Sequence, residues 1–523
     1  MKSPLKLILV TLTIVFLLLP LAQEHLRLFD FRPLTGVVAE DPLPKAGLAQ
    51  FSNQRLQRWI DAHLRLNYGF REPLTRLYNQ YLWDFYGQTN LVETKKIYIG
   101  DDGWIYESQH VEEYYVGKGR WYASDSLGMA EYFGKEALRL YQLQQILETQ
   151  NTHLFVLLLP GKEVVYPEHV PETDDYPHNK VFSATEFYHQ TFDELGVNYI
   201  DVNPWFLQMK DTVDYLLYPQ TGTHWSNYAA LYVADSLIRY MEQLGDIRME
   251  HFTIGEREER TEYPDDDLEQ LMNLARPLPK APNYYAPYTI IEDSTASHPY
   301  LITIGDSYFW NLVNATPFGK VMGNLRYWYY FSSVYFDNKH DNIKEVDVLQ
   351  DVIDADFVMV AYCTPQIYVM SQGFSQRLLL DICCNHDDLA MAQKQAIKTI
   401  HNSPVWMKRM VDLSNEYDIP IDTVVYGEAM NTVLKYPEQF IDILKDTVPT
   451  QRSLRYTIAI NRHNEEVVEM MEKIRQNEPW YESVAKQAEK RHLSVEDNLC
   501  LNAIYVLEQR ATASAGRVEP QSD

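Results

Sequence analysis

Strand-like and helix-like segments alternate through the middle of the chain. Four short segments are predicted to be strands: residues 154–159, 198–202, 300–304 and 357–361. Residues 154–159 and 357–361 are continuous apolar runs, and residues 300–304 are interrupted only by Thr303; such runs are typical of strands buried on both faces of a sheet. A longer stretch with apolar residues at helical spacing precedes each of the first three: residues 129–149, 184–195 and 227–244. This alternation predicts an α/β fold, in which helices sandwich a parallel sheet.

The N-terminus carries a targeting segment. Lys2 and Lys6 precede an apolar run at residues 7–22, which is compatible with the core of a signal peptide or with a signal anchor. Lysines before the run place the N-terminus in the cytoplasm and the rest of the chain outside it. No convincing small-residue cleavage site follows, so an uncleaved anchor in the inner membrane is favoured over a cleaved signal. In both cases the body of the chain is extracytoplasmic, in the periplasm or at the cell surface.

The remaining patterns divide the chain into four parts. In order, they are a signal anchor or signal peptide (1–28), a proline-rich stalk with a helical stem and a hairpin (29–119), the α/β domain (120–378) and a helical module (379–523). The hairpin is predicted around Asp101-Asp102-Gly103. Inside the α/β domain, residues 245–298 are acidic and rich in proline, and they are predicted to form a surface loop.

The helical module contains an internal repeat. Residues 400–406 (IHNSPVW) recur as residues 474–480 (IRQNEPW), at an offset of 74 residues. Each copy predicts a helix that begins near the tryptophan, a turn and a second helix. Two copies are too few for a solenoid, so the repeat is predicted to serve packing or an interaction rather than chemistry.

Composition excludes several classes of function. The net charge of −27 argues against a nucleic-acid partner, because there is no basic surplus to neutralise phosphates. The four cysteines have no CxxC metal spacing and are too few for a disulfide framework. The sequence contains no metal-ligand constellation and no nucleotide-binding loop, so we expect neither a metal nor another cofactor.

Two polar segments carry the candidate chemistry. Ser307 follows the predicted strand at 300–304, so it lies at the carboxyl end of a strand, where open α/β sheets place their sites. Gly305 allows the chain to turn tightly, and backbone N–H groups after the turn can hold an oxyanion. His224 stands where a loop meets the predicted helix at 227–244. It can supply the general base that a serine nucleophile requires.

These segments, taken with three others, resemble one family. The matching motifs, in the family's order, are residues 69–71 (GFR) with 78–79 (YN), 100–104 (GDDGW), 160–171 (PGKEVVYPEHVP), 224–225 (HW) and 305–307 (GDS). Over residues 50–375 or so, the chain resembles the alginate-type polysaccharide O-acetyltransferases, the AlgJ/AlgX group of SGNH-hydrolase-like proteins.

The resemblance implies an SGNH-hydrolase-like fold for residues 120–378 and the activity of a serine O-acetyltransferase. Ser307 and His224 would be the catalytic pair, and acetyl would pass through an acetyl-serine to a hydroxyl of an exported polysaccharide. It also implies a membrane-bound O-acyltransferase as the partner that supplies acetyl across the membrane. This is the chemistry of exopolysaccharide biosynthesis.

The chain departs from the family at one position. The family usually has Asp two residues before the histidine, where it orients the imidazole, but this chain has Gly222. Three explanations remain open. Another acid serves, with Asp201 at its strand end as the preferred candidate; or Gln220 or a backbone carbonyl orients the ring; or the site is inactive. Loss of an orienting carboxylate can cost on the order of 10⁴ in rate.

Further residues are candidates for oxyanion or substrate contacts. They are Gly305, Tyr308, Thr364, Lys162, Trp225 and Tyr329. Lys162 is a candidate ligand of an acidic sugar, with an ordinary surface lysine as the favoured alternative. The aromatic segment at 327–330 is a candidate stacking surface, with core packing as the favoured alternative. Thr364 follows the predicted strand at 357–361, where it would line the oxyanion site.

Two other functions compete with the transferase. A carbohydrate acetylesterase would use the same residues with water as the acceptor. A catalytically inactive scaffold that binds glycans would fit both Gly222 and the appended repeats. Activity that depends on Ser307 separates the scaffold from the enzymes, and acceptor competition separates the two enzymes.

Overall fold

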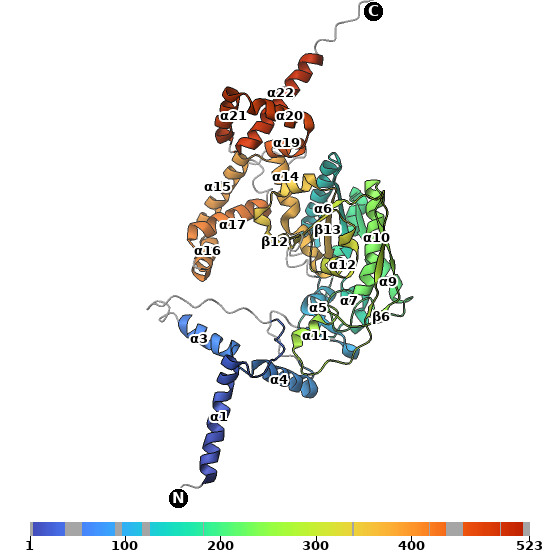
Figure 1. The fold of residues 1–523 in the computed structure, drawn as a ribbon, viewed down its shortest axis with the longest axis vertical. Coiled ribbons are helices and arrows are strands. Elements are labelled where there is room, and N and C mark those ends of the chain that lie inside the picture. Colours follow the sequence, from blue (N-terminus) through green and yellow to red (C-terminus); the bar gives the residue numbers. More distant parts are fainter. Residues whose placement is uncertain are drawn as a thin grey trace, which may run out of the picture.

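A seven-stranded sheet forms the centre of the protein (Figure 1). The computed structural model describes residues 4–36, 55–88, 97–117, 126–180, 182–336, 339–417, 419–435, 453–491 and 493–515. The strand order is β12-β11-β10-β9-β13-β3-β4. The strands are β3 (His153–Leu159), β4 (Tyr199–Asp201), β9 (Tyr300–Gly305), β10 (Asn324–Tyr329), β11 (Ser333–Phe336), β12 (Lys339–Asn342) and β13 (Phe357–Cys363).

The predicted α/β class is confirmed, with an addition at one edge. Strands β10, β9, β13, β3 and β4 pair in parallel, and all four predicted strands are among them. Strands β11 and β12 extend this sheet as an antiparallel edge. The sheet is therefore mostly parallel, and β9, which leads into Ser307, lies in its interior.

Alternate side chains of the central strands enter two separate cores. In β3, Val156 and Leu158 join the core on one face, whereas Phe155 and Leu157 join the core on the other. Because side chains of a strand point to opposite faces in turn, a strand between two cores must be apolar throughout. The continuous apolar runs in the sequence have this physical origin.

Helices cover both faces of the sheet. The helices on one face are α6 (Ser126–Glu148), α8 (Ala184–Leu195), α13 (Val348–Asp354) and α14 (Phe374–Cys383). On the other face are α5 (Ser108–Tyr115), α9 (Asn203–Lys210), α10 (Asn227–Gly245) and α12 (Phe309–Ala315). A short helix, α7 (Lys162–Val165), follows β3 directly. The result is a three-layer sandwich.

The described residues of the N-terminal part form helices and one hairpin. The helices are α1 (Pro4–Leu26), α3 (Arg55–Leu66) and α4 (Arg71–Tyr86). The predicted hairpin is present: β1 (Ile97–Ile99) pairs antiparallel with β2 (Ile105–Glu107). Between the strands, Asp102 and Gly103 adopt positive φ angles of 55° and 80°. Residues 8–26 of α1 are long and apolar enough to cross a membrane.

The insertion at 245–298 is not the surface loop predicted from its prolines and acids. It contains two antiparallel pairs, β5 (His251–Ile254) with β8 (Tyr288–Ile291) and β6 (Glu258–Glu259) with β7 (Tyr284–Tyr285). It also contains α11 (Asp267–Met272), whose Leu268 and Met272 are buried beneath the hairpin. Because burial of the acidic segment depends on partners far away in sequence, local composition misidentified it.

The C-terminal module is helical, as predicted. Its helices are α15 (His386–Asn402), α16 (Pro404–Tyr417), α17 (Ile421–Lys435), α19 (Leu454–Asn461), α20 (Glu465–Arg475), α21 (Glu478–Arg491) and α22 (Val495–Ala515). The first group, α15–α17, packs into the same core as α6, α8, α13 and α14, whereas α20–α22 form a separate hydrophobic core. Only the second group therefore has its own hydrophobic centre.

Replacement of Leu158 by alanine should lower the stability of the α/β sandwich by about 2–5 kcal/mol, because it leaves a cavity in a closed core. Leu138→Ala is the matched control, since Leu138 is 44% exposed on α6 and its loss should cost about 0.5 kcal/mol or less. Thermal and denaturant unfolding of the full chain would measure both. Equal costs for the two variants would contradict the two-core arrangement.

Candidate active site

Ser307 lies just beyond the carboxyl end of β9. Gly305 packs so closely on β13 that a Cβ atom would stand 2.6 Å from the Ala361 carbonyl oxygen, so no larger residue fits there. The Asp306 carboxylate, 1% exposed, accepts hydrogen bonds from the backbone N–H of Tyr308 at 3.1 Å and of Cys363 at 2.8 Å. The turn that presents Ser307 is therefore clamped to the neighbouring strand.

His224 is held by the start of α10. Ser226 caps this helix by accepting the backbone N–H of Ala229 at 3.1 Å. Trp225 donates its indole N–H to the Tyr308 carbonyl at 3.1 Å, and Asn311 donates to the Trp225 carbonyl at 3.0 Å. These contacts join the loop of His224 to the helix that follows Ser307, which fixes the two side chains relative to each other.

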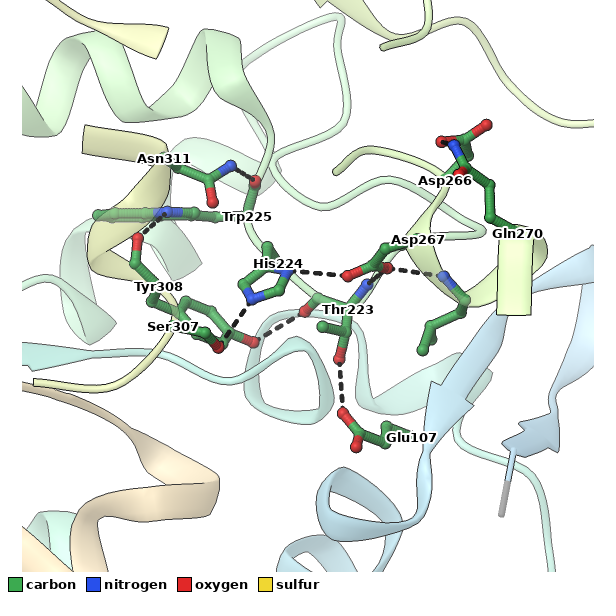
Figure 2. Close-up of polar contacts among 12 residues, drawn as sticks. Glu107, Thr223, His224, Trp225, Asp266, Asp267, Gln270, Ser307, Tyr308 and Asn311 are labelled. Atoms are coloured by element: carbon green, nitrogen blue, oxygen red, sulfur yellow. Dashed lines mark hydrogen bonds and ion pairs between the residues drawn. The ribbon is translucent and has the colours of Figure 1, made fainter. Parts of the chain in front are cut away.

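Serine, histidine and aspartate form a continuous hydrogen-bonded chain (Figure 2). Ser307 Oγ lies 2.9 Å from His224 Nε2, and His224 Nδ1 lies 2.9 Å from an Asp267 carboxylate oxygen. The other Asp267 oxygen accepts the backbone N–H of Thr223 at 2.8 Å and of Leu268 at 2.7 Å. This is the arrangement of nucleophile, base and orienting acid that activates a serine.

The orienting acid is Asp267, which corrects the expectation of Asp201. The Asp201 carboxylate caps α9, where it accepts the backbone N–H and the side-chain amide of Asn203, both at 2.8 Å. Gln220 is also engaged elsewhere, since its amide oxygen accepts the backbone N–H of Ala281 at 2.6 Å. No local pattern located Asp267; the only signal was a run of three acids at 265–267.

The same contact explains Gly222. A Cβ atom at this position would lie 2.7 Å from the Asp265 carbonyl oxygen and 3.0 Å from that of Pro264. An aspartate side chain at 222 would therefore collide with the segment that carries Asp267. Because residue 222 is glycine, the backbone of residues 264–265 can lie against it. Asp267, two residues farther along, then supplies the carboxylate that orients His224.

The electrostatics favour a histidine that can accept and hold a proton. Burial lowers the pKa of His224, but the hydrogen bond to Asp267 and the negative charges of Asp267 and Asp306 outweigh it, so the pKa is raised overall. Burial also raises the pKa of the Asp306 carboxyl. A carboxylate next to the imidazole stabilises the imidazolium that forms when a serine is deprotonated.

Lys162 is not a sugar ligand. Its side chain is completely buried, and its ammonium donates to the carbonyls of Ile105 at 2.7 Å, Gln220 at 2.9 Å and Gly222 at 2.8 Å. The rings of Trp104 and Tyr106 lie 5.0 Å from the nitrogen. Burial lowers the pKa of this lysine. Lys162 therefore holds the loop before His224 against the hairpin.

A buried histidine, His110, contacts the residue that precedes His224. His110 Nδ1 contacts Glu163, and its Nε2 lies 3.0 Å from the Thr223 hydroxyl. His110 is fully buried and Glu163 nearly so, which prevents either from reaching a substrate. The sequence does not predict this pair, because a histidine and a glutamate 53 residues apart give no motif.

Three further candidates prove to be buried supports. Trp225 is fully buried, Tyr308 is 1% exposed and donates its hydroxyl to the Thr223 carbonyl, and Thr364 donates to the Leu159 carbonyl at 3.2 Å. None of these side chains can line an oxyanion or sugar site, since each is closed off from solvent. Gly305 likewise acts through its close packing on Ala361 rather than through substrate contact.

The aromatic segment at 327–330 divides between core and site. Tyr327 and Trp328 are buried, whereas Tyr329 and Tyr330 are partly exposed. Tyr330 follows β10 with a φ of 48°, donates its backbone N–H to Gly305 and interacts through its side chain with Ser307. Left-handed backbone at a bulky residue is costly and is concentrated at functional sites. The sequence places Tyr330 in the candidate stacking segment but does not distinguish it from its neighbours.

A match to a family model agrees with this geometry. Residues 97–308 match the SGNH hydrolase-like domain of the acetyltransferase AlgX. This part of the chain is therefore similar to the AlgX acetyltransferase domain. The matched residues include Ser307, His224 and Asp267 and end one residue beyond the candidate nucleophile. The match indicates an enzyme of the acyltransferase or esterase type.

Solved structures with low sequence identity match about half of the chain. The O-acetyltransferase domain of Pseudomonas putida AlgJ is 15% identical, with a TM-score of 0.35, and the match covers 52% of this chain and 92% of that one. Pseudomonas aeruginosa AlgX is 13% identical, with a TM-score of 0.33, covering 54% and 66%. Bacillus cereus PatB1 is 12% identical, with a TM-score of 0.33, covering 53% and 97%. No curated protein matches the chain.

Asp267→Asn should reduce kcat for an activated acetyl ester by on the order of 10³–10⁴-fold, because the amide no longer stabilises the imidazolium. Asp201→Asn is the matched control and should leave turnover unchanged, since Asp201 only caps α9. Steady-state hydrolysis of 4-nitrophenyl acetate by the full chain in detergent measures both. A loss confined to Asp201→Asn would reverse the assignment.

Gly222→Ala should destabilise the protein by about 1–3 kcal/mol, because the added methyl overlaps the Asp265 carbonyl. Gly427→Ala is the control: nothing lies within 4 Å of its Cβ position in α17, so alanine there should be neutral or stabilising. Thermal unfolding measures both changes. Gly222→Asp should also fail to restore activity to Asp267→Asn; restored turnover would contradict the packing argument.

Proposed function

We propose that the protein is an extracytoplasmic O-acetyltransferase that acetylates an exported polysaccharide through an acetyl-serine at Ser307. The AlgX-family domain supports an acetyl-transfer reaction on a polysaccharide. The observation that carries the proposal is the unbroken Ser307–His224–Asp267 chain, with both hydrogen bonds at 2.9 Å. It argues against an inactive scaffold, because one of the two features that suggested one, Gly222, is compensated by Asp267.

In the first half-reaction Ser307 becomes acetylated. His224 Nε2 accepts the hydroxyl proton while Ser307 Oγ attacks the acetyl carbonyl of the donor, whose oxygen becomes an oxyanion. The tetrahedral intermediate then collapses. The bond to the donor's leaving oxygen breaks, and the proton on His224 passes to that oxygen. Asp267 stabilises the imidazolium in between.

The second half-reaction runs the same steps with a sugar hydroxyl. The hydroxyl loses its proton to His224 and its oxygen attacks the acetyl-serine carbonyl. When this second intermediate collapses, the Ser307 oxygen leaves and takes the proton back from His224. The acetyl group is then an ester of the polysaccharide and the site is regenerated. No cofactor enters this scheme.

The backbone around Ser307 would stabilise the oxyanion in both halves. The Tyr308 N–H is engaged by Asp306, so the N–H of Ser307 itself is the backbone donor we assign to the oxyanion. The Tyr330 phenol beside Ser307 is a second candidate donor. Tyr329, partly exposed and packed on Tyr330 with ring centroids 4.5 Å apart, offers a surface on which a sugar ring could stack.

The proposed setting requires a membrane and an acetyl supply. Residues 8–26 of α1 are compatible with an anchor that leaves the domain outside the cytoplasm. A membrane-bound O-acyltransferase would deliver acetyl to Ser307. Both statements extend the family resemblance and the N-terminal pattern, and the assay below does not depend on either.

Ser307→Ala should abolish the release of acetyl from 4-nitrophenyl acetate, because the hydroxyl is the attacking group. The full chain in detergent, treated with excess ester, should show a burst equal to the amount of enzyme. Mass spectrometry should find one added acetyl group on the peptide containing Ser307. Ser294→Ala, which removes an exposed hydroxyl outside the site, is the matched control and should behave as wild type.

Two outcomes would change the assignment. Equal, background-level signals from wild type and Ser307→Ala would favour the glycan-binding scaffold. A burst followed by hydrolysis that added oligosaccharide does not divert would favour the acetylesterase. Transfer of acetyl to the oligosaccharide in competition with water supports the transferase.

A further inference from the structure

Helix α4 is inverted relative to an ordinary amphipathic helix. Its two buried residues, Asn79 and Gln80, are polar, and they face the protein beside the partly buried Trp83. Asn79 donates to the Met272 carbonyl of α11 at 2.7 Å, and Gln80 accepts the backbone N–H of Arg276 at 3.0 Å. A surface helix of a soluble protein normally buries its apolar face and exposes its polar one.

The outward side of α4 is apolar and aromatic instead. Its exposed residues follow helical spacing along one face: Leu74, Leu77, Tyr78, Tyr81 and Phe85. Leu77 is 61% exposed and Phe85 is 73% exposed. A contiguous exposed patch of this kind marks a surface that contacts something other than water.

The position of α4 identifies what it contacts. Gly69, two residues before α4, lies against the end of α1: its Cβ position is 2.2 Å from the Pro20 carbonyl oxygen and 2.8 Å from Gln23 Cβ. Phe70 packs against Phe29 and Phe31, which follow α1, with ring centroids 6.4 Å and 5.8 Å apart. The helix therefore starts at the level of the last turns of the apolar helix that is long enough to span a membrane.

The orientation of the helices fits the same reading. Figure 1 shows α4 lying across the axis of α1, with α11 on the side of α4 away from the free end of α1. A helix that crosses a transmembrane helix at the end of its apolar span lies in the plane of the bilayer surface. Tyrosine and phenylalanine are common at that level, where amphipathic rings occupy the headgroup region.

Charge supports a lipid surface as well. Residues 55–76 contain five arginines and two acidic residues, in a chain whose net charge is −27. A locally basic stretch next to an apolar helix face is the composition of a helix that binds at a bilayer interface.

We propose that the outward face of α4, formed by Leu74, Leu77, Tyr78, Tyr81 and Phe85, inserts into the interfacial region of the bilayer that α1 spans. This contact is additional to the N-terminal anchor. Because α4 is bonded to α11 through Asn79 and Met272, and α11 begins at Asp267, it would hold the active site at a set height and orientation above the lipid surface.

The depth of α4 can be measured on the full chain in vesicles of phosphatidylethanolamine and phosphatidylcholine that hold no other protein. A nitroxide is attached to Leu77→Cys, and its collision rates with lipid-soluble oxygen and with a water-soluble nickel complex are compared. Tyr505→Cys, equally exposed at 61% but on α22, is the aqueous control, and Ile14→Cys on α1 is the membrane control. The four native cysteines are buried, so unsubstituted protein gives the labelling background.

The Leu77 label should collide several-fold less with the nickel complex and more with oxygen than the Tyr505 label, approaching the Ile14 label. If it behaves like Tyr505, α4 lies in water and the proposal is wrong. If it is shielded from both reagents, the face is covered by protein, which also overturns the lipid assignment. Water exposure of the Ile14 label would show that α1 does not span the bilayer, and this result would also overturn the proposal. None of these outcomes depends on acetyl transfer, so they leave the proposed function to its own test.

Discussion

The packing of residues 264–265 against Gly222 determines how the active site is built. The loop before His224 comes within van der Waals contact of a backbone from a different part of the fold, and there is no room for a side chain between them. Two residues later that backbone begins α11 with Asp267, whose carboxylate reaches His224. The close packing of the two backbones thus leaves no room for an acid at position 222 and brings the acid at position 267 to His224.

Much of the buried polar structure serves to hold that approach in place. Lys162 gathers three carbonyls, two of them in the loop before His224 and one in the hairpin. His110 and Glu163 support the Thr223 hydroxyl, and Asp267 accepts the Thr223 N–H. A buried charge destabilises the fold unless it is paired or hydrogen-bonded. Such a network therefore adds little stability, and its main effect is to fix the geometry of the loop. Its cost is consistent with a loop that must present His224 to Ser307 at one distance.

The support extends from the site to the N-terminal helices. α11 carries Asp267 at its first residue and receives Asn79 of α4 at its last, so one six-residue helix joins the acid of the site to the stem. On its other side the hairpin of β1 and β2 packs against the same helix. The acid of the site and the stem are therefore linked through one short helix.

Local sequence determined four strands of the central sheet, the three long helices α6, α8 and α10, the hairpin, and the choice of Ser307 and His224 as the catalytic pair. These features depend on periodicity and on turn residues next to an apolar run, such as Gly305-Asp306-Ser307 after β9, so the chain states them locally. The partner of His224 could not be predicted, because it is set by how residues 245–298 fold over Gly222. The same limit made Lys162, Trp225, Tyr308 and Thr364 seem available to substrate, although each is buried by residues distant in the chain. Burial and orientation are properties of the packed protein, and only the tertiary structure decided them.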